Sequence, residues 1–174
     1  MSVEIGLLRG INVGGKGVLP MAELRVLLAG LGAQDVKTYI QSGNAAWAGH
    51  VDEAALADAI EAARGFRPEV MILPIDSFAA VAANNPFPEV DDPKALHVFF
   101  LASPSLADEA VLEAVKGPGE RFQLTERALY LHLPNYLSGS PLTPRLERLL
   151  GVPATGRNWR SVERILEMAR EIDA

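Results

Sequence analysis

The 174-residue sequence contains no cysteine. Disulfides, thiolate metal sites and cysteine nucleophiles are therefore excluded. The sequence also lacks any apolar run near the roughly 20 residues that a membrane helix needs. Its first ten residues carry Glu4 and have no basic start, so they do not resemble a signal peptide. We therefore expect a cytoplasmic protein that has no membrane partner.

Positive charge is also in deficit. The chain carries 16 lysine and arginine residues against 22 aspartate and glutamate residues, which gives a formal net charge of −6. Broad electrostatic binding to nucleic acid needs a surplus of cations, so nucleic acid is a disfavoured partner. Apolar residues make up 49% of the chain and charged residues 22%, a balance that predicts a globular protein with a buried core.

Histidine is scarce, and the three histidines, His50, His97 and His132, are far apart in the sequence. None of them has metal-ligand spacing, so we predict structural histidines and no metal site. The sequence also shows no readable arrangement of serine, histidine and aspartate. It therefore assigns no catalytic residue and no cofactor, and it leaves open whether the protein is an enzyme.

Hydrophobic periodicity predicts the same order of elements in both halves of the chain. The first half is predicted to hold a strand at 3–10, a helix at 19–32, two strands within 36–49, a helix at 51–65 and a strand at 68–74. The second half is predicted to hold a strand at 95–103, a helix at 105–117, a hairpin at 121–134, a short helix at 143–151 and a strand at 152–157.

Two further helices are predicted outside these repeats, one at 76–84 and one at 158–171. Asn158 is placed to cap the last helix. Ser105, with Asp108 three residues later, forms a capping-box pattern at the start of the helix at 105–117.

The predicted fold is α+β, with two tandem ferredoxin-like (βαββαβ) subdomains that contain antiparallel sheets. The Pro- and Asp-rich stretch "NNPFPEVDDP" gives the best internal boundary. We assign residues 1–85 to the first subdomain with its linking helix, 86–93 to a connector, and 94–174 to the second subdomain with its C-terminal helix. Both are expected to belong to one compact molecule.

The stretch "RGINVGGKG" at residues 9–17, here called the Gly-rich loop, partly matches a nucleotide phosphate loop. In a true phosphate loop, Lys is followed by Ser or Thr on the first turn of a helix. Here Gly17 follows Lys16 and cannot hold a metal, and Val18, Leu19 and Pro20 delay the helix by about a turn. The next two strands also form a tight hairpin where that fold needs parallel strands and crossovers. We therefore reject a phosphate loop of this kind.

A different ligand site is predicted at the same place. In a ferredoxin-like sheet the first strand is parallel to the second, so the Gly-rich loop and the hairpin turn lie at one edge of the sheet. Cations, polar side chains and glycine amides at this edge suit a phosphate or carboxylate. The residues in this prediction are Arg9, Gly10, Asn12, Gly14, Gly15, Lys16, Gln41, Ser42 and Asn44. The alternative interpretation is that the glycines only permit tight turns.

The opening segment "LLRGINVGGKGVLPMAELRVLLAGLGAQDVKTYIQSGNAAW", together with the late "GVPATGRNW", resembles the bacterial domain-of-unknown-function family 1697. The resemblance implies a tandem ferredoxin-like α+β fold. It implies no activity, cofactor or catalytic residue. This chain departs from the family pattern at Gly17, where members often have Asn, and at Gly156, where they often have Thr. Both departures remove a hydrogen-bonding side chain.

One segment of the chain, residues 145–164, is clearly basic. It contains Glu147 and Glu163 against five arginines, Arg145, Arg148, Arg157, Arg160 and Arg164. We predict Arg157 and Asn158 as further ligand-binding residues, and we expect Trp159 to pack into the core. Whether Arg157 and Asn158 lie beside the Gly-rich loop depends on how the two halves dock, which the sequence does not specify.

Three classes of function stay open. The leading one is binding of a small anionic ligand, a nucleotide or a phosphorylated metabolite, through the Gly-rich loop. The second is association with nucleic acid through residues 145–164. The third is a protein-interaction module without catalysis, present as a monomer or a homodimer.

Overall fold

The computed structural model describes residues 1–174, and the chain divides into two compact units. The first unit comprises residues 1–80 and 163–174, and the second unit comprises residues 81–162. Two helices contribute residues to both units, α3 (Ile75–Ala83) and α6 (Trp159–Asp173). The subdomain boundaries predicted from the sequence, 1–85 and 94–174, remain a prediction.

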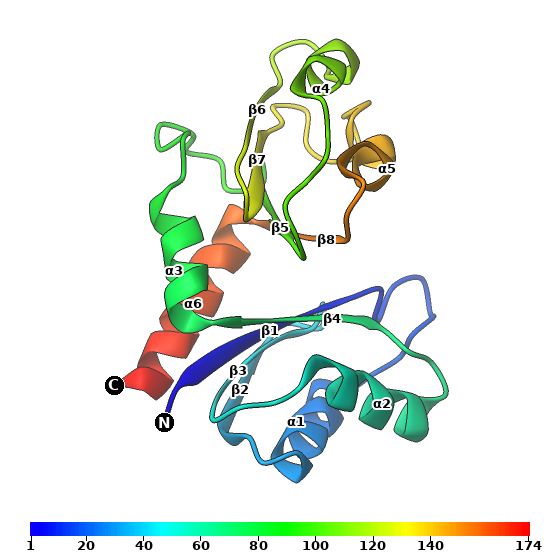
Figure 1. Ribbon diagram of the computed structural model, residues 1–174, viewed down its shortest axis with the longest axis vertical. Coiled ribbons are helices and arrows are strands. Elements are labelled where there is room, and N and C mark those ends of the chain that lie inside the picture. Colours follow the sequence, from blue (N-terminus) through cyan, green and yellow to red (C-terminus); the bar gives the residue numbers. More distant parts are fainter. The chain divides into compact units, whose positions relative to one another are not determined.

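The first unit contains a four-stranded antiparallel sheet in the order β2-β3-β1-β4. Its elements are β1 (Val3–Arg9), α1 (Met21–Gly30), β2 (Gln34–Tyr39), β3 (Asn44–Ala48), α2 (Glu53–Arg64) and β4 (Glu69–Pro74). Figure 1 shows α1 and α2 together on one side of this sheet. Leucines of both helices pack there with Trp47, which is fully buried.

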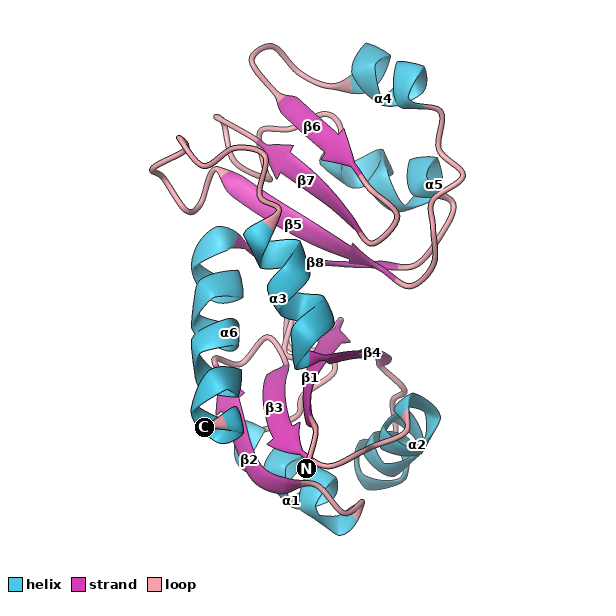
Figure 2. Cartoon of the chain, turned by 60° about the vertical axis from the view of Figure 1, so that its left-hand side comes forward, coloured by secondary structure: helices cyan, strands magenta, loops and turns pink.

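The second unit repeats this topology in the order β6-β7-β5-β8. Its elements are β5 (Leu96–Leu101), α4 (Glu109–Val115), β6 (Arg121–Leu124), β7 (Ala128–His132), the 3-10 turn Thr143–Arg145, α5 (Leu146–Leu150) and β8 (Ala154–Asn158). Leu112 of α4 and Leu146 and Leu150 of α5 pack against Leu129 and Leu131 of β7. Figure 2 shows the helices, strands and loops of both units.

Both units therefore have the strand order and connections of a ferredoxin-like βαββαβ unit. The predicted α+β fold with two antiparallel sheets is confirmed, and so are the linking helix and the C-terminal helix. The predicted cap is also confirmed, because Asn158 Oδ1 accepts a hydrogen bond from the Ser161 amide at 2.9 Å. None of the helices has the length and apolar character that crossing a membrane requires.

The capping box predicted at Ser105 is wrong. Helix α4 begins at Glu109, and the Asp108 side chain caps it by accepting a hydrogen bond from the Ala110 amide. The Ser105 hydroxyl instead donates to the Leu150 carbonyl oxygen at the end of α5, at 2.7 Å. Ser105 Oγ also accepts a hydrogen bond from the Ala107 amide at 3.0 Å, so Ser105 holds the loop before α4 and does not cap the helix.

Candidate functional site

The Gly-rich loop forms a small hairpin of its own directly after β1. Val13 and Lys16 pair through two backbone hydrogen bonds of 3.0 and 3.2 Å, and Asn12 donates its amide to the Gly17 carbonyl oxygen at 2.9 Å. The two residues at the tip, Gly14 and Gly15, have φ values of 59° and 75°. Positive φ at both central positions is typical of a type I′ turn, which glycine adopts without a steric cost.

Asn12 fastens the base of this hairpin to its surroundings. Its Nδ2 donates to the carbonyl oxygens of Leu19 and Gln41 at 2.9 and 2.7 Å, and its Oδ1 accepts from the Leu19 amide at 2.8 Å. Asn12 itself has a φ of 53°, a conformation that asparagine tolerates better than most residues. The Asn12 side chain therefore joins the loop to the start of α1 and to the turn between β2 and β3.

That turn comprises residues 40–43 and lies at the same edge of the sheet as the Gly-rich loop, as predicted. Leu8 of β1 donates its amide to the Gly43 carbonyl oxygen at 2.8 Å, and Asn12 Nδ2 donates to the Gln41 carbonyl oxygen.

Asn44 is fully buried, and its Nδ2 donates to the Tyr39 carbonyl oxygen and to Ser42 Oγ, both at 3.0 Å. Gln41 and Ser42 are exposed. The turn therefore exposes the polar side chains of Gln41 and Ser42, and the buried Asn44 side chain stabilises the turn through its hydrogen bonds.

Ile40, the first residue of this turn, has an unfavourable backbone conformation. Its φ is 49°, and its side chain is 50% exposed. A β-branched residue in the left-handed region carries a steric cost of about 1–2 kcal/mol. Exposure at this level returns little burial energy, so the rest of the turn must hold Ile40 in place.

The two cations of the predicted site are in different environments. Arg9 forms an ion pair with Glu69 of β4, its cross-strand neighbour, with Nη1 and Oε2 3.2 Å apart. Lys16 is exposed next to the tip of the loop and makes no ion pair. The amides of Gly14 and Gly15 have no protein acceptor either. One cation and two amide donors therefore face solvent from a loop that is fixed at its base.

The departures from the family pattern at Gly17 and Gly156 have separate structural settings. Gly17 has a φ of 63°, a region that asparagine also visits. A Cβ atom at Gly156 would lie 2.5 Å from Cε1 of Phe99 on the neighbouring strand β5. The ring of Phe99 therefore occupies the space that a threonine side chain would need.

The basic segment does not present its five arginines on one exposed surface. Arg157, in β8, is only 9% exposed, and its Nη1 donates to the Gly156 carbonyl oxygen at 2.8 Å. Burial lowers the pKa of Arg157 to about 10, so it stays charged near neutral pH. Arg164 pairs with Glu167 at 3.2 Å. Asn158 uses its side chain to cap α6, and Trp159 is half-buried.

Comparison with known proteins places the sequence in a family. The model of the family described as protein of unknown function, DUF1697, matches residues 1–130, about three quarters of the chain. The chain belongs to the DUF1697 family. A comparison with curated proteins found no match.

Among solved structures, this DUF1697 protein is similar to the conserved bacterial protein SP0830 from Streptococcus pneumoniae. The two are 25% identical, the match covers 97% of this chain and 98% of the other, and the TM-score is 0.67. The family match includes the Gly-rich loop and the turn at 40–43, whereas Arg157 and Asn158 lie beyond it. The comparisons thus show a family and a fold, and no activity.

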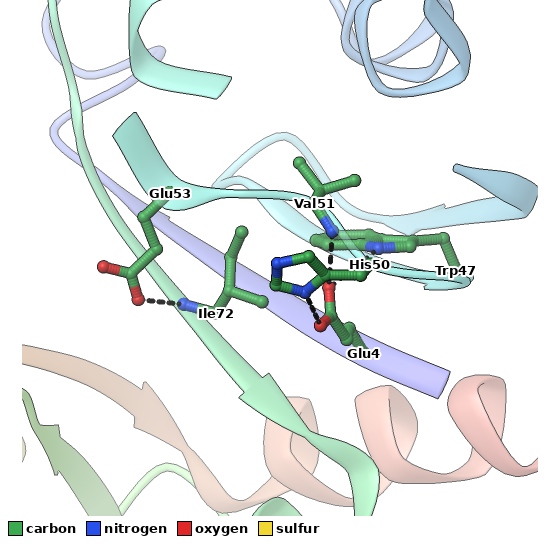
Figure 3. A network of polar contacts seen from close by, with 6 residues as sticks. All are labelled: Glu4, Trp47, His50, Val51, Glu53 and Ile72. Atoms are coloured by element: carbon green, nitrogen blue, oxygen red, sulfur yellow. Dashed lines mark hydrogen bonds and ion pairs between the residues drawn. The ribbon is translucent and has the colours of Figure 1, made fainter. Parts of the chain in front are cut away.

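A second polar cluster in this DUF1697 protein escaped the sequence analysis (Figure 3). The carboxylate of Glu4, on β1, is almost buried and accepts hydrogen bonds from Trp47 Nε1 at 3.2 Å and from the Val51 amide at 3.0 Å. Its other oxygen lies 2.8 Å from His50 Nδ1. The hydrogen bond to Glu4 raises the pKa of His50, and the negative charge of Glu4 adds to the rise.

The Glu4 cluster has a clear structural role. Glu4 accepts hydrogen bonds from the indole N–H of Trp47, the largest core side chain, and from the backbone amide of Val51, which lies just before α2. A glutamate in a strand with period-two alternation is normally read as solvent-exposed, and its partners are 43 to 47 residues away. No local signal in the sequence could have identified this cluster.

Proposed function

We propose that the protein binds a small anionic ligand at the Gly-rich loop of the first unit. The observation that carries the proposal is the exposure of Lys16, without an ion-pair partner, next to the two unbonded amides of Gly14 and Gly15. An ammonium group and backbone amides are the donors that hold phosphates and carboxylates in proteins. The exposed side chains of Gln41 and Ser42 supply further hydrogen bonds at the same edge.

The internal bonding of the loop supports this proposal in a second way. Binding is weakened when a flexible loop must first become ordered. Here the Val13–Lys16 pairing and the three hydrogen bonds of Asn12 fix the loop before a ligand arrives. These bonds also limit which groups can contact a ligand, because the amides of Asn12 and Lys16 and the side chain of Asn12 already have hydrogen-bond partners within the protein. The ligand class that we propose is a nucleotide or a phosphorylated metabolite.

A thermal-shift screen tests the proposal. The wild-type protein and Lys16→Ala are heated with nucleotides, sugar phosphates and short oligonucleotides. A ligand at about one hundred times its Kd stabilises the native state by about 2.7 kcal/mol, which raises Tm by about 5–10 °C in a chain of this size. We expect one class of phosphorylated compound to give such a shift with wild type and none with Lys16→Ala.

Lys94→Ala is the matched control, because Lys94 is an exposed lysine of the second unit. It should keep the full shift. Lys16→Ala should itself change the free energy of unfolding by less than about 0.5 kcal/mol, since the side chain is exposed and unpaired. An equal shift in Lys16→Ala, or no shift of wild type with any compound, would contradict the proposal.

A second candidate function, a protein-interaction module, is favoured by apolar side chains near the same loop. Val13, Val18 and Ile40 are 66%, 48% and 50% exposed. Such a group beside a fixed turn suits contact with another protein surface. Sedimentation velocity over a hundredfold concentration range tests whether that surface belongs to a second copy. A concentration-dependent dimer that Val13→Ser disrupts would support this function, and a monomer throughout would exclude self-association.

A further inference from the structure

The first unit contains an open groove that is separate from the Gly-rich loop. It lies along β2, which is an edge strand of the sheet, between α1 and the C-terminal part of α6. Figure 2 shows this part of α6 beside β2. The groove encloses about 350 Å³, near the lower end of the volumes of small-molecule sites.

Two guanidinium groups line this β2–α6 groove. Arg25 of α1 donates from Nη1 to Thr38 Oγ1 at 2.6 Å and has no carboxylate partner. This bond uses only one of the N–H donors of the Arg25 guanidinium. Arg164 of α6 uses Nη1 for Glu167, at 3.2 Å. Arginine forks of this kind hold carboxylates and phosphates through two parallel hydrogen bonds.

The charge of the groove is positive, although the protein as a whole is negative. Arg25, Lys37 and Arg164 face two carboxylates, Glu167 and Glu171, which leaves a surplus of one positive charge. Lys37 forms an ion pair with Glu171, in which Nζ and Oε2 are 2.7 Å apart. The uncompensated charge belongs to Arg25, so an anion would be held most strongly at the α1 side of the groove.

Tyr39 adds a flat aromatic surface to the same lining. The guanidinium carbon of Arg164 lies 5.9 Å from the centroid of the Tyr39 ring, within the range of a cation–π contact. Met168 contributes a polarisable thioether, which packs well against aromatic rings. An aromatic ring, a thioether and arginine planes together suit a ligand that is itself planar.

We propose that the β2–α6 groove binds a small anion that carries a planar aromatic ring, of mononucleotide size or smaller. The anionic group bonds to Arg25, and the ring lies against Tyr39 and Met168. A peptide strand added to β2 fits less well, because the register of β2 shifts between Gln34 and Lys37 and Asp35 there has a φ of 51°. Irregularities of this kind protect an edge strand from pairing.

This inference does not depend on the proposed function, since the groove and the Gly-rich loop share no residue. The test uses isothermal titration of the whole protein with four probes. Adenosine 5′-monophosphate and 4-hydroxybenzoate carry both a ring and a negative charge, adenosine carries the ring alone, and inorganic phosphate carries the charge alone. We expect saturable binding of at least one of the two ring anions, tighter than the binding of adenosine or phosphate.

Two variants and one control place that binding in the groove. Arg25→Gln should weaken the ring anion about tenfold or more, because a charge-assisted hydrogen bond is lost. Tyr39→Leu should weaken the ring anion and leave phosphate unchanged. Arg170→Gln, an exposed arginine of α6 outside the groove, should have no effect. Because Arg25 is exposed, Arg25→Gln decides the question even if Tyr39→Leu lowers stability.

Three outcomes would overturn the inference. The first is the absence of saturable binding by either ring anion. The second is an unchanged affinity in Arg25→Gln. The third is loss of binding in Lys16→Ala while Arg25→Gln binds normally. That result would place the ligand at the Gly-rich loop, which rejects the groove and supports the proposed function.

Discussion

The first connection of each unit joins a strand to a helix at the same point of the βαββαβ order, yet the two connections are built differently. In the first unit, four glycines and Asn12 make a hairpin that displays Lys16. In the second unit, residues 102–108 make the same connection without a glycine, and Ser105 holds them through the Leu150 carbonyl oxygen and the Ala107 amide.

This difference shows that the fold itself does not require the glycines. The topology needs a change of direction between strand and helix, and the second unit achieves it with ordinary residues. The Gly-rich loop adds a fixed hairpin with an exposed lysine, a feature that the connection between elements does not demand. A ligand-binding loop on a rigid scaffold has these properties.

The two units also differ in how they treat histidine. His50 of the first unit is exposed and bonded to Glu4, which raises its pKa. His97 of the second unit is 6% exposed, and its Nδ1 has no hydrogen-bond partner. Burial lowers the pKa of His97 to about 4. One unit therefore favours the protonated imidazole and the other favours the neutral imidazole.

The largest effect that we predict follows from His97. Its pKa is about 4 in the folded protein and about 6.5 in the unfolded chain, so the unfolded state binds more protons between these values. Stability is lost as pH falls from 6.5 to 4, by about 3 kcal/mol from this group. His50 acts in the opposite direction, because its contribution is present below pH 6.5 and fades as pH rises through its raised pKa.

Urea unfolding of wild type and His97→Leu at pH 7 and pH 4.5 measures this effect. The leucine variant should lose much less stability on acidification, because a buried apolar side chain has no proton to gain. An identical loss in both proteins would show that His97 is not the group responsible.

The second effect compares the two connections directly. Asn12→Ala removes three hydrogen bonds and places alanine at positive φ, so we expect a loss of about 2–3 kcal/mol in the free energy of unfolding. Ser105→Ala removes two hydrogen bonds of a neutral hydroxyl and should cost about 1 kcal/mol. Urea unfolding of the two variants checks the order, and an equal or smaller loss for Asn12→Ala would contradict it.

The third effect is a gain in stability. Ile40→Asn replaces a β-branched residue at a φ of 49° by one that tolerates this region, so we expect a stabilisation of about 1 kcal/mol. Val26→Asn is the control, since Val26 is an exposed β-branched residue within helix α1. It should give no stabilisation. A loss of stability in Ile40→Asn would mean that the Ile40 side chain makes contacts that outweigh its backbone strain.

Much of the fold could be predicted because its signals are local. The strands at the start of each half are short apolar runs, Asn158 precedes the helix that it caps, and the turn at 40–43 contains Ser42 and Gly43. The shared edge of the Gly-rich loop and this turn followed from topology alone. These features depend on neighbours in the sequence or on the rules of one small fold.

The parts that could not be predicted depend on distant partners. Glu4 is buried because Trp47 and Val51 donate hydrogen bonds to it, and the Ser105 hydroxyl donates to the Leu150 carbonyl oxygen. The β2–α6 groove exists because α6 belongs in part to the first unit, so that Arg164 lies over Tyr39. Sequence patterns report the character of each segment, whereas these contacts depend on which segments meet.

We infer that the Gly-rich loop, and not its counterpart in the second unit, holds an anion. Proton–nitrogen NMR of the uniformly labelled protein, titrated with the phosphorylated compound that gives the largest thermal shift, tests it within one spectrum. We expect saturable shifts of the Gly14, Gly15 and Lys16 amides, with residues 102–108 unchanged. Shifts of both connections to the same extent, or of neither, would contradict it.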